Sequence, residues 1–328
     1  MKKARKTEFQ ANQEELKIRA AWLYFVEGLT QEQVAERLGM NRIKAWRLLA
    51  AARQDGSVQI SINTQAEPNI RLQRDLEKHC SLEEAIVVPS SSDMDESVAT
   101  VVGHATGRYI SSHIDNGLTI GVGWGSTFQV SMRSLSWREV KDVTVISLLG
   151  GLSHTTLLNP SAAAWRLADV YNTELYQIMA PVFTGDEHLA QLLWAQNDLK
   201  ELHRKAQEID LALVSVSDIS KNASIFHRKL LTWEEGMSLK EAGAVGDVLC
   251  HFVDRNGQVI DHPVNKRVMA INPNELRKIP RVVLSSGSVR KVEAIRAGIL
   301  ATNATTLITD EAAAKALLAL DPIVRDSR

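Results

Sequence analysis

The chain has 328 residues, of which 45% are hydrophobic and 23% charged. This ordinary globular composition excludes extensive disorder and leaves room for two domains. No apolar run reaches transmembrane length, the basic start lacks the apolar segment of a secretory signal, and the two cysteines form no CxxC, so we expect a reduced, cytoplasmic protein.

The net charge of −1 conceals an uneven distribution. Residues 1–60 carry 11 Lys and Arg against 7 Asp and Glu, a balance of +4, whereas the remainder carries 27 against 32, a balance of −5. A basic head on an acidic body is typical of a DNA-binding module joined to a part that does not contact DNA. A solvated basic tail would give the same balance, so the charge carries weight only beside a DNA-binding motif.

Two short helices joined by a tight turn are predicted over residues 30–49, after a first helix over 14–27 that Gly28 ends. Gly39 lies at the turn, where φ can be positive. Apolar residues at helical spacing flank it: Val34, Ala35, Leu38, Ala45, Leu48 and Leu49. This is the spacing of a helix-turn-helix that presents its second helix to the DNA major groove.

Polar residues mark the two helix starts. Thr30 with Gln33 fits a capping box, and Asn41 fits the cap of the second helix. Arg can contact guanine, Asn can contact adenine, and Lys favours phosphate. The predicted DNA-binding residues are Thr30, Gln31, Asn41, Arg42, Lys44 and Arg47. The alternative is an ordinary solvated helix face.

The segment after the second helix predicts the domain boundary. Residues 57–63 alternate as in a short strand, which would be one arm of a wing, and residues 69–79 form a charged helix that is a connector or part of a dimer contact. We therefore expect a DNA-binding domain over 1–63, a connector over 64–82, and an effector and oligomerisation domain over 83–328.

Apolar runs of strand length alternate with helical stretches in the remainder of the chain. The predicted strands are residues 85–88, 118–122, 143–149, 175–179, 211–216, 248–253, 267–271, 281–284 and 306–308. The predicted helices are residues 128–135, 161–171, 187–208, 289–300 and 310–320. This alternation implies an α/β fold with a mainly parallel sheet that is covered on both faces.

The sequence GVGWGST (residues 121–127) follows a predicted strand and precedes a predicted helix. Glycines allow backbone N–H groups to approach an anion, and hydroxyls and a helix N-terminus add donors and positive charge, so the loop predicts a phosphate or polyol site. Its candidate residues are Gly123, Trp124, Gly125, Ser126 and Thr127. A tight turn with a capping serine is the alternative.

Three residues outside this loop are further candidates for the same site. Gly151 lies in a second turn at a strand end, Asp247 precedes an apolar strand, and Lys291 lies near the start of a predicted helix. A lysine there opposes the helix dipole unless an anion shares the site. A turn cap for Asp247 and a solvated position for Lys291 are the alternatives. The scattered histidines and the lack of GxSxG predict no metal, no cofactor and no catalytic triad.

Taken together, the chain resembles the SorC/DeoR-type sugar-binding transcriptional regulators of bacteria over about residues 14–321. The resemblance rests on the helix-turn-helix, GVGWGST, VISLLGG, GDVLCHFVDRNG and SSGSVRKVEAIRAGILATNATTLITDEAAAKALL in this order. It implies a Rossmann-like effector domain similar to the fold of glucosamine-6-phosphate deaminase and isomerases, and a homo-oligomer, dimeric or often tetrameric. It also implies that a sugar, sugar phosphate or polyol controls operator affinity through the loop, Asp247 and Lys291.

The chain departs from the family pattern at three places. Ser286 and Gly287 replace a common Gly pair before the lysine helix, His251 replaces a frequent Arg, and NRIKAWRLL replaces a Ser/Thr-rich start of the recognition helix. The first two departures weaken the phosphate features and slightly favour an unphosphorylated polyol or a pentose or tetritol as the ligand. We predict a repressor of a sugar or polyol catabolic operon. The alternative is a sugar-phosphate isomerase or deaminase that would use Asp247 with His251.

Overall fold

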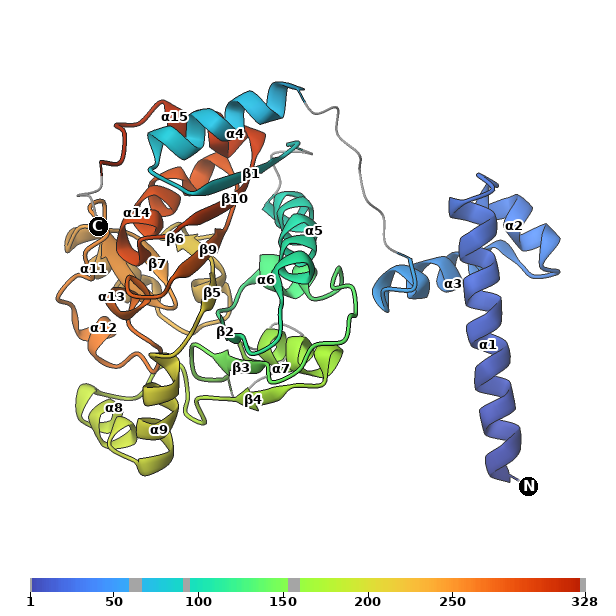
Figure 1. The fold of residues 1–328 in the computed structure, drawn as a ribbon, viewed down its shortest axis with the longest axis horizontal. Helices are drawn as coiled ribbons and strands as arrows, with labels where there is room; N and C mark the ends of the chain where they lie inside the picture. The colour runs from blue at the N-terminus through green and yellow to red at the C-terminus, as the bar shows by residue number, and fades with distance from the viewer. Residues whose placement is uncertain (1, 59–66, 91–94, 153–159, 325–328) are drawn as a thin grey trace. The chain divides into compact units, whose positions relative to one another are not determined.

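The computed structural model describes four stretches of the chain: residues 2–58, 67–90, 95–152 and 160–324. The chain divides into two compact units, Met1–Asn63 and Thr64–Arg328 (Figure 1). In the described stretches, no helix has the length and apolar character needed to span a membrane. Of the predicted wing strand, all residues beyond Val58 lie outside the described stretches.

The described part of the first unit consists of α1 (Lys2–Phe25), α2 (Gln31–Arg37) and α3 (Arg42–Gln54). Its core joins all three helices through Ala20, Val34, Ala35, Ala45 and Leu49. The predicted apolar stripes of α2 and α3 are therefore confirmed, while α1 begins well before its expected start.

The predicted ends of these helices are also confirmed. Gly28 and Gly39 have φ of +72° and +62°. The hydroxyl of Thr30 accepts the N–H of Gln33, whose side chain accepts the N–H of Thr30 in return. Asn41 Oδ1 accepts a backbone N–H from the first turn of α3 at 2.8 Å. Local side-chain chemistry therefore fixes where α2 and α3 begin.

A buried cation ties α1 to the end of α3. The ammonium group of Lys17 pairs with Glu14 and with Asp55, the residue that follows α3. Burial opposes the charge of Lys17, but hydrogen bonds to Asp55 and Glu14 and their negative charges outweigh this effect and raise its pKa. The ion pair of Lys17 with Asp55 therefore links the end of α3 to α1.

In the second unit, the described strands form two sheets. The large sheet is entirely parallel in the order β1-β10-β9-β5-β2-β3-β4. Its strands are β1 (Glu84–Val88), β2 (Thr119–Val122), β3 (Thr144–Ser147), β4 (Glu174–Tyr176), β5 (Leu211–Val214), β9 (Arg281–Ser285) and β10 (Thr306–Asp310). The small sheet is antiparallel and consists of β6 (Val216–Asp218), β7 (Ala244–Val248) and β8 (His251–Asp254).

Helices cover both faces of the large sheet, as predicted (Figure 1). Along β5, Leu211 and Leu213 pack with α5, α6 and α7, whereas Ala212 and Val214 pack with α4, α9, α14, α15 and the small sheet. The larger helices are α4 (Glu67–His79), α5 (Asp95–His113), α6 (Ser126–Ser131), α7 (Pro160–Tyr171), α8 (Glu187–Trp194), α9 (Asn197–Ala206), α11 (Trp233–Glu241), α14 (Val292–Thr302) and α15 (Glu311–Leu318). Short turns of helix are α10 (Ser224–His227), α12 (Pro263–Lys266), α13 (Pro273–Leu276) and the 3-10 turn η1 (Val289–Lys291).

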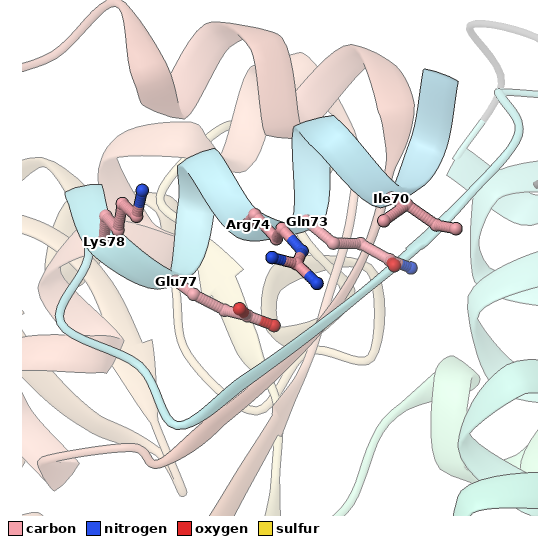
Figure 2. A pocket seen from close by; sticks show the side chains of 5 residues that line it. All are labelled: Ile70, Gln73, Arg74, Glu77 and Lys78. Atoms are coloured by element: carbon pink, nitrogen blue, oxygen red, sulfur yellow. The ribbon is translucent and has the colours of Figure 1, made fainter. Parts of the chain in front are cut away.

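Helix α4, which covers much of the expected connector, packs on β1 and α15 in the second unit. Glu77 Oε1 accepts the N–H of Ala85 on β1 at 3.1 Å. Figure 2 shows Glu77 and Arg74 beside each other on α4, along a shallow pocket above this strand. A carboxylate thus satisfies a donor on the open edge of the sheet.

Several predicted elements are wrong in extent. Residues 211–216 do not form one strand, because the chain leaves the large sheet at Ser215 and enters β6. Residues 248–253 do not form one strand, because Leu249 and Cys250 have positive φ and make the turn between β7 and β8. Residues 187–208 break into α8 and α9, and residues 267–271 make only isolated bridges.

The close packing of α5 on α6 provides a test of the fold. A Cβ at Gly107 would clash with the carbonyl oxygen of Ser131 and lie 2.8 Å from Cβ of Ser134. Gly107→Ala should therefore lower stability by a net ~1–2 kcal/mol despite the better helix propensity of alanine. A Cβ at Gly185 would meet nothing within 4 Å, so Gly185→Ala should keep the wild-type thermal midpoint. Equal midpoints for both variants would contradict the packing.

Candidate functional site

A polar cavity lies at the carboxyl ends of β2 and β5 in the second unit. The chain runs outward from β2 through β3 to β4, and in the opposite direction from β5 through β9 to β10. Ligands of parallel α/β sheets bind where the strand order reverses in this way. The cavity is lined by Trp124, Gly125, Ser126, Thr127, Ser215, Val216, Ser217, Ser224, Ile225, Asp247 and Lys291.

The loop after β2 is held against the end of β5. The N–H of Gly123 donates to the oxygen of Leu213 at 2.8 Å, and the hydroxyl of Ser215 donates to the oxygen of Trp124 at 2.8 Å. Gly125 has φ of +134°, and a Cβ there would lie 2.9 Å from Oγ of Ser215. Glycine is therefore required at residue 125 both for the backbone conformation and for the close approach.

Ser126 is the first residue of α6, and it does not cap that helix. The N-cap is Gly125, and it supplies no side-chain hydrogen bond. The capping role that the alternative gave to a serine is therefore wrong. Ser126 and the buried Thr127 line the cavity instead.

Asp247 lies on β7 with 4% of its surface exposed. Its Oδ2 accepts the N–H of Cys250 at 3.0 Å. Burial raises the pKa of Asp247 to about 7; the Cys250 hydrogen bond and the charge of Lys291 oppose this rise, and the charge of Asp218 adds to it. The carboxyl group is thus poised to exist in either protonation state near neutral pH.

The cations of η1 lie beside this carboxyl group. Arg290 Nε is 3.1 Å from Oδ2 of the buried Asp218, so its charge is largely balanced within the protein. Lys291, half-buried, lines the cavity with Asp247. The cavity lining therefore combines one cation with a carboxyl group of raised pKa.

Sequence reasoning missed three hydroxyl groups of the cavity. Ser215 and Ser217 follow β5, Ser224 begins α10, and all three line the cavity. Ser217 is paired directly with Asp247 across β6 and β7. The alternation of serine with apolar residues at the end of a predicted strand was the available signal. With Ser126 and Thr127, these groups offer several donors and acceptors to a polyhydroxylated ligand.

Six of the eight predicted effector residues line the cavity, and two do not. Gly123 lies behind the loop, where a Cβ would meet the Leu213 oxygen at 3.0 Å. Gly151 is bonded elsewhere, since its N–H donates to the oxygen of Ala180 at 2.9 Å. In the described stretches, no group of three or more His, Cys, Asp or Glu is arranged to hold a metal ion.

His251 does not join Asp247 in an acid-base pair. His251 pairs with Val248 across the hairpin and Asp247 with Phe252, so the two side chains point to opposite faces of the small sheet. Burial lowers the pKa of His251 to about 4, and a hydrogen bond that the ring donates to the backbone of Leu249 opposes this shift. The imidazole is therefore neutral at physiological pH and faces away from the cavity.

The predicted DNA-binding residues lie at the N-terminal ends of α2 and α3, except Arg47, which lies further along α3. The side-chain oxygens of Thr30 and Asn41 are engaged as helix caps. Arg42, Lys44 and Arg47 are exposed along α3. They present three cations on a helix whose opposite face forms the core of the unit.

Comparisons with known proteins give one consistent match. Residues 64–319 match the sequence model of a family described as "Putative sugar-binding domain" (Sugar-bind). The chain is 30% identical over 305 residues to the "Erythritol catabolism regulatory protein EryD" of Brucella abortus (strain 2308), covering 92% of this chain and 96% of that protein. It is 28% identical over 306 residues to the "Deoxyribonucleoside regulator" of Bacillus subtilis (strain 168), covering 93% and 97%. The full-length sorbitol operon regulator SorC from Klebsiella pneumoniae has the same fold, with a TM-score of 0.70, 23% identity, and coverage of 93% of this chain and 98% of that chain.

The raised pKa of Asp247 predicts a pH-dependent stability. Between its usual value of 3.8 and about 7, the folded protein holds a proton that the unfolded chain releases, so stability falls as pH rises through this window. Asp247→Asn should remove this dependence and become progressively more stable than wild type from pH 4 to pH 7. Urea unfolding at several pH values measures the effect. Asp261→Asn, at an exposed carboxylate, should follow wild type. Parallel profiles for wild type and Asp247→Asn would refute the assignment.

Proposed function

This chain belongs to the Sugar-bind family of transcriptional regulators, and we propose that it binds operator DNA through a helix-turn-helix and a carbohydrate effector through the cavity. One observation supports this proposal most directly: the same chain contains two kinds of feature. The second unit has a polar cavity where the strand order reverses, and the first unit has capped helices that carry exposed cations. The domains of this proposal are residues 1–63 for DNA binding and the following α/β unit for effector binding and assembly.

The first unit supports the proposal for DNA. Its α2 and α3 have the turn, caps and shared core of a helix-turn-helix. Arg42, Lys44 and Arg47 are exposed on α3, and residues 1–60 carry a net charge of +4. Positive charge on the exposed face of such a helix suits a phosphate backbone.

The cavity supports a sugar, sugar phosphate or polyol as effector. Ser126, Thr127 and Ser217 supply hydroxyl groups, Asp247 can accept from ligand hydroxyls, and Lys291 can donate. A relative that is 30% identical is named as a regulator of erythritol catabolism, which supports the same ligand class. The parallel sheet of the second unit supports our proposal that this unit has a Rossmann-like fold of the deaminase and isomerase type.

We propose that the protein is cytoplasmic and represses its operon. We also propose that it acts as a homo-oligomer, either a dimer or a tetramer. Operator DNA is cytoplasmic in bacteria, and helix-turn-helix proteins bind two half-sites as dimers. Trp137, Trp165 and Met179 of the second unit are exposed large apolar residues, and such residues support contacts between subunits. The relatives are named regulators and not enzymes, so the isomerase or deaminase alternative is abandoned.

DNA binding under effector control tests the function. The full chain should bind a duplex from upstream of its own gene in fluorescence anisotropy, with affinity that falls steeply with salt. A panel of polyols, sugars and their phosphates should contain one compound that lowers this affinity at least tenfold, which requires about 1.4 kcal/mol of differential binding. A scrambled duplex is the control. Binding that ignores sequence would overturn the proposal.

Lys291 tests the effector site separately. Lys291→Ala should keep operator binding but lose the response to the effector, because the cavity loses its cation. Wild type at one hundred times the effector Kd gains about 2.7 kcal/mol of stability, and this thermal shift should largely vanish in the variant. Lys278→Ala, at an exposed lysine that does not line the cavity, should respond as wild type. A normal response in Lys291→Ala would remove Lys291 from the site.

A further inference from the structure

Two large apolar side chains are exposed on α3. Ile43 is 64% and Trp46 is 55% exposed. They lie three residues apart and share one stripe of the helix with Arg47 and Ala50, at i, i+3, i+4 and i+7. The core of the unit lies on the opposite side of the helix, so neither side chain stabilises the fold by burial.

The surroundings of this stripe favour nucleic acid over an apolar protein surface. Arg42, Lys44 and Arg47 are exposed on the same helix, and the described part of α3 carries no acidic residue in its first turn. A second copy of the chain would have to bring these cations together with their equivalents. A DNA groove instead offers phosphates on both sides of the helix.

The base edges of the major groove present one apolar group, the C5-methyl group of thymine. An isoleucine and a tryptophan on the outer stripe of a groove-binding helix are the side chains that such methyl groups can contact. Arg47 follows Trp46 on the same stripe, one turn along the helix from Ile43, and is available to a phosphate or guanine. The stripe therefore contains both apolar and cationic contacts for a thymine-containing site.

We propose that Ile43 and Trp46 select thymine in the operator by packing against its C5-methyl groups. This inference rests on the proposed DNA-binding function. It assigns base selectivity to two residues that are not among the polar contacts expected of α3. Each buried methyl group is expected to contribute about fourfold in affinity.

The test removes the methyl group without changing base pairing. Full-length protein selects a duplex from a random pool, and each thymine of that duplex is replaced in turn by deoxyuridine. Wild type should lose about fourfold in affinity at one or more positions. Ile43→Ala and Trp46→Ala should each bind the thymine duplex more weakly and become insensitive to deoxyuridine at the position that each residue contacts.

Matched controls lie on α1, where Ile18 is 46% and Trp22 is 58% exposed. Ile18→Ala and Trp22→Ala should keep the affinity and deoxyuridine sensitivity of wild type, and all four variants should keep its thermal midpoint. Sequence-selective binding that is indifferent to deoxyuridine overturns the inference and leaves the proposed function standing. A changed oligomeric state in Ile43→Ala or Trp46→Ala, without loss of deoxyuridine sensitivity, overturns it in favour of contacts between copies. No selective binding to any duplex overturns both.

Discussion

The reversal of strand order between β2 and β5 is the constraint on which the effector site depends. After β2 the chain turns into α6, whereas after β5 it leaves the large sheet for the small one, so the two connections diverge and open a cavity between them. Ser215 marks the departure and also bonds the neighbouring loop at Trp124. The same residue therefore ends a strand, fixes the loop and lines the cavity.

The electrostatics of the cavity follow from this geometry. Asp247 is carried into the interior by β7, and its burial disfavours the charged form. Arg290 balances Asp218 nearby, which leaves Lys291 as the cation beside Asp247. A ligand hydroxyl that donates to Asp247 would stabilise its carboxylate, so a hydroxylated effector would offset the cost of burying this charge.

The sequence predicted those features that local chemistry determines. The caps at Thr30 and Asn41, the glycine turn at residue 39 and the alternation of strands and helices depend on residues close in the chain, and they are confirmed. The turn at Leu249 and Cys250 could not be predicted, because positive φ is unusual for two apolar residues. The N–H of Cys250 donates a hydrogen bond to Asp247 in this turn. Ile43 and Trp46 were missed for a related reason: an apolar residue in a helix is usually read as core, and only burial reveals that these two are exposed.

In the proposed regulator, effector and operator both shift the equilibrium between conformations of the protein, so each must change the binding affinity of the other. If the effector lowers operator affinity by some factor, the operator lowers effector affinity by the same factor. A cavity built from separate elements suits this role, because a ligand that bridges the ends of β2, β5 and β7 favours one arrangement of these elements over others. The anchoring of α3 through Lys17 and Asp55 serves the opposite requirement. If α3 is the helix that contacts operator bases, as proposed, its orientation within the first unit must stay fixed for it to keep its sequence preference.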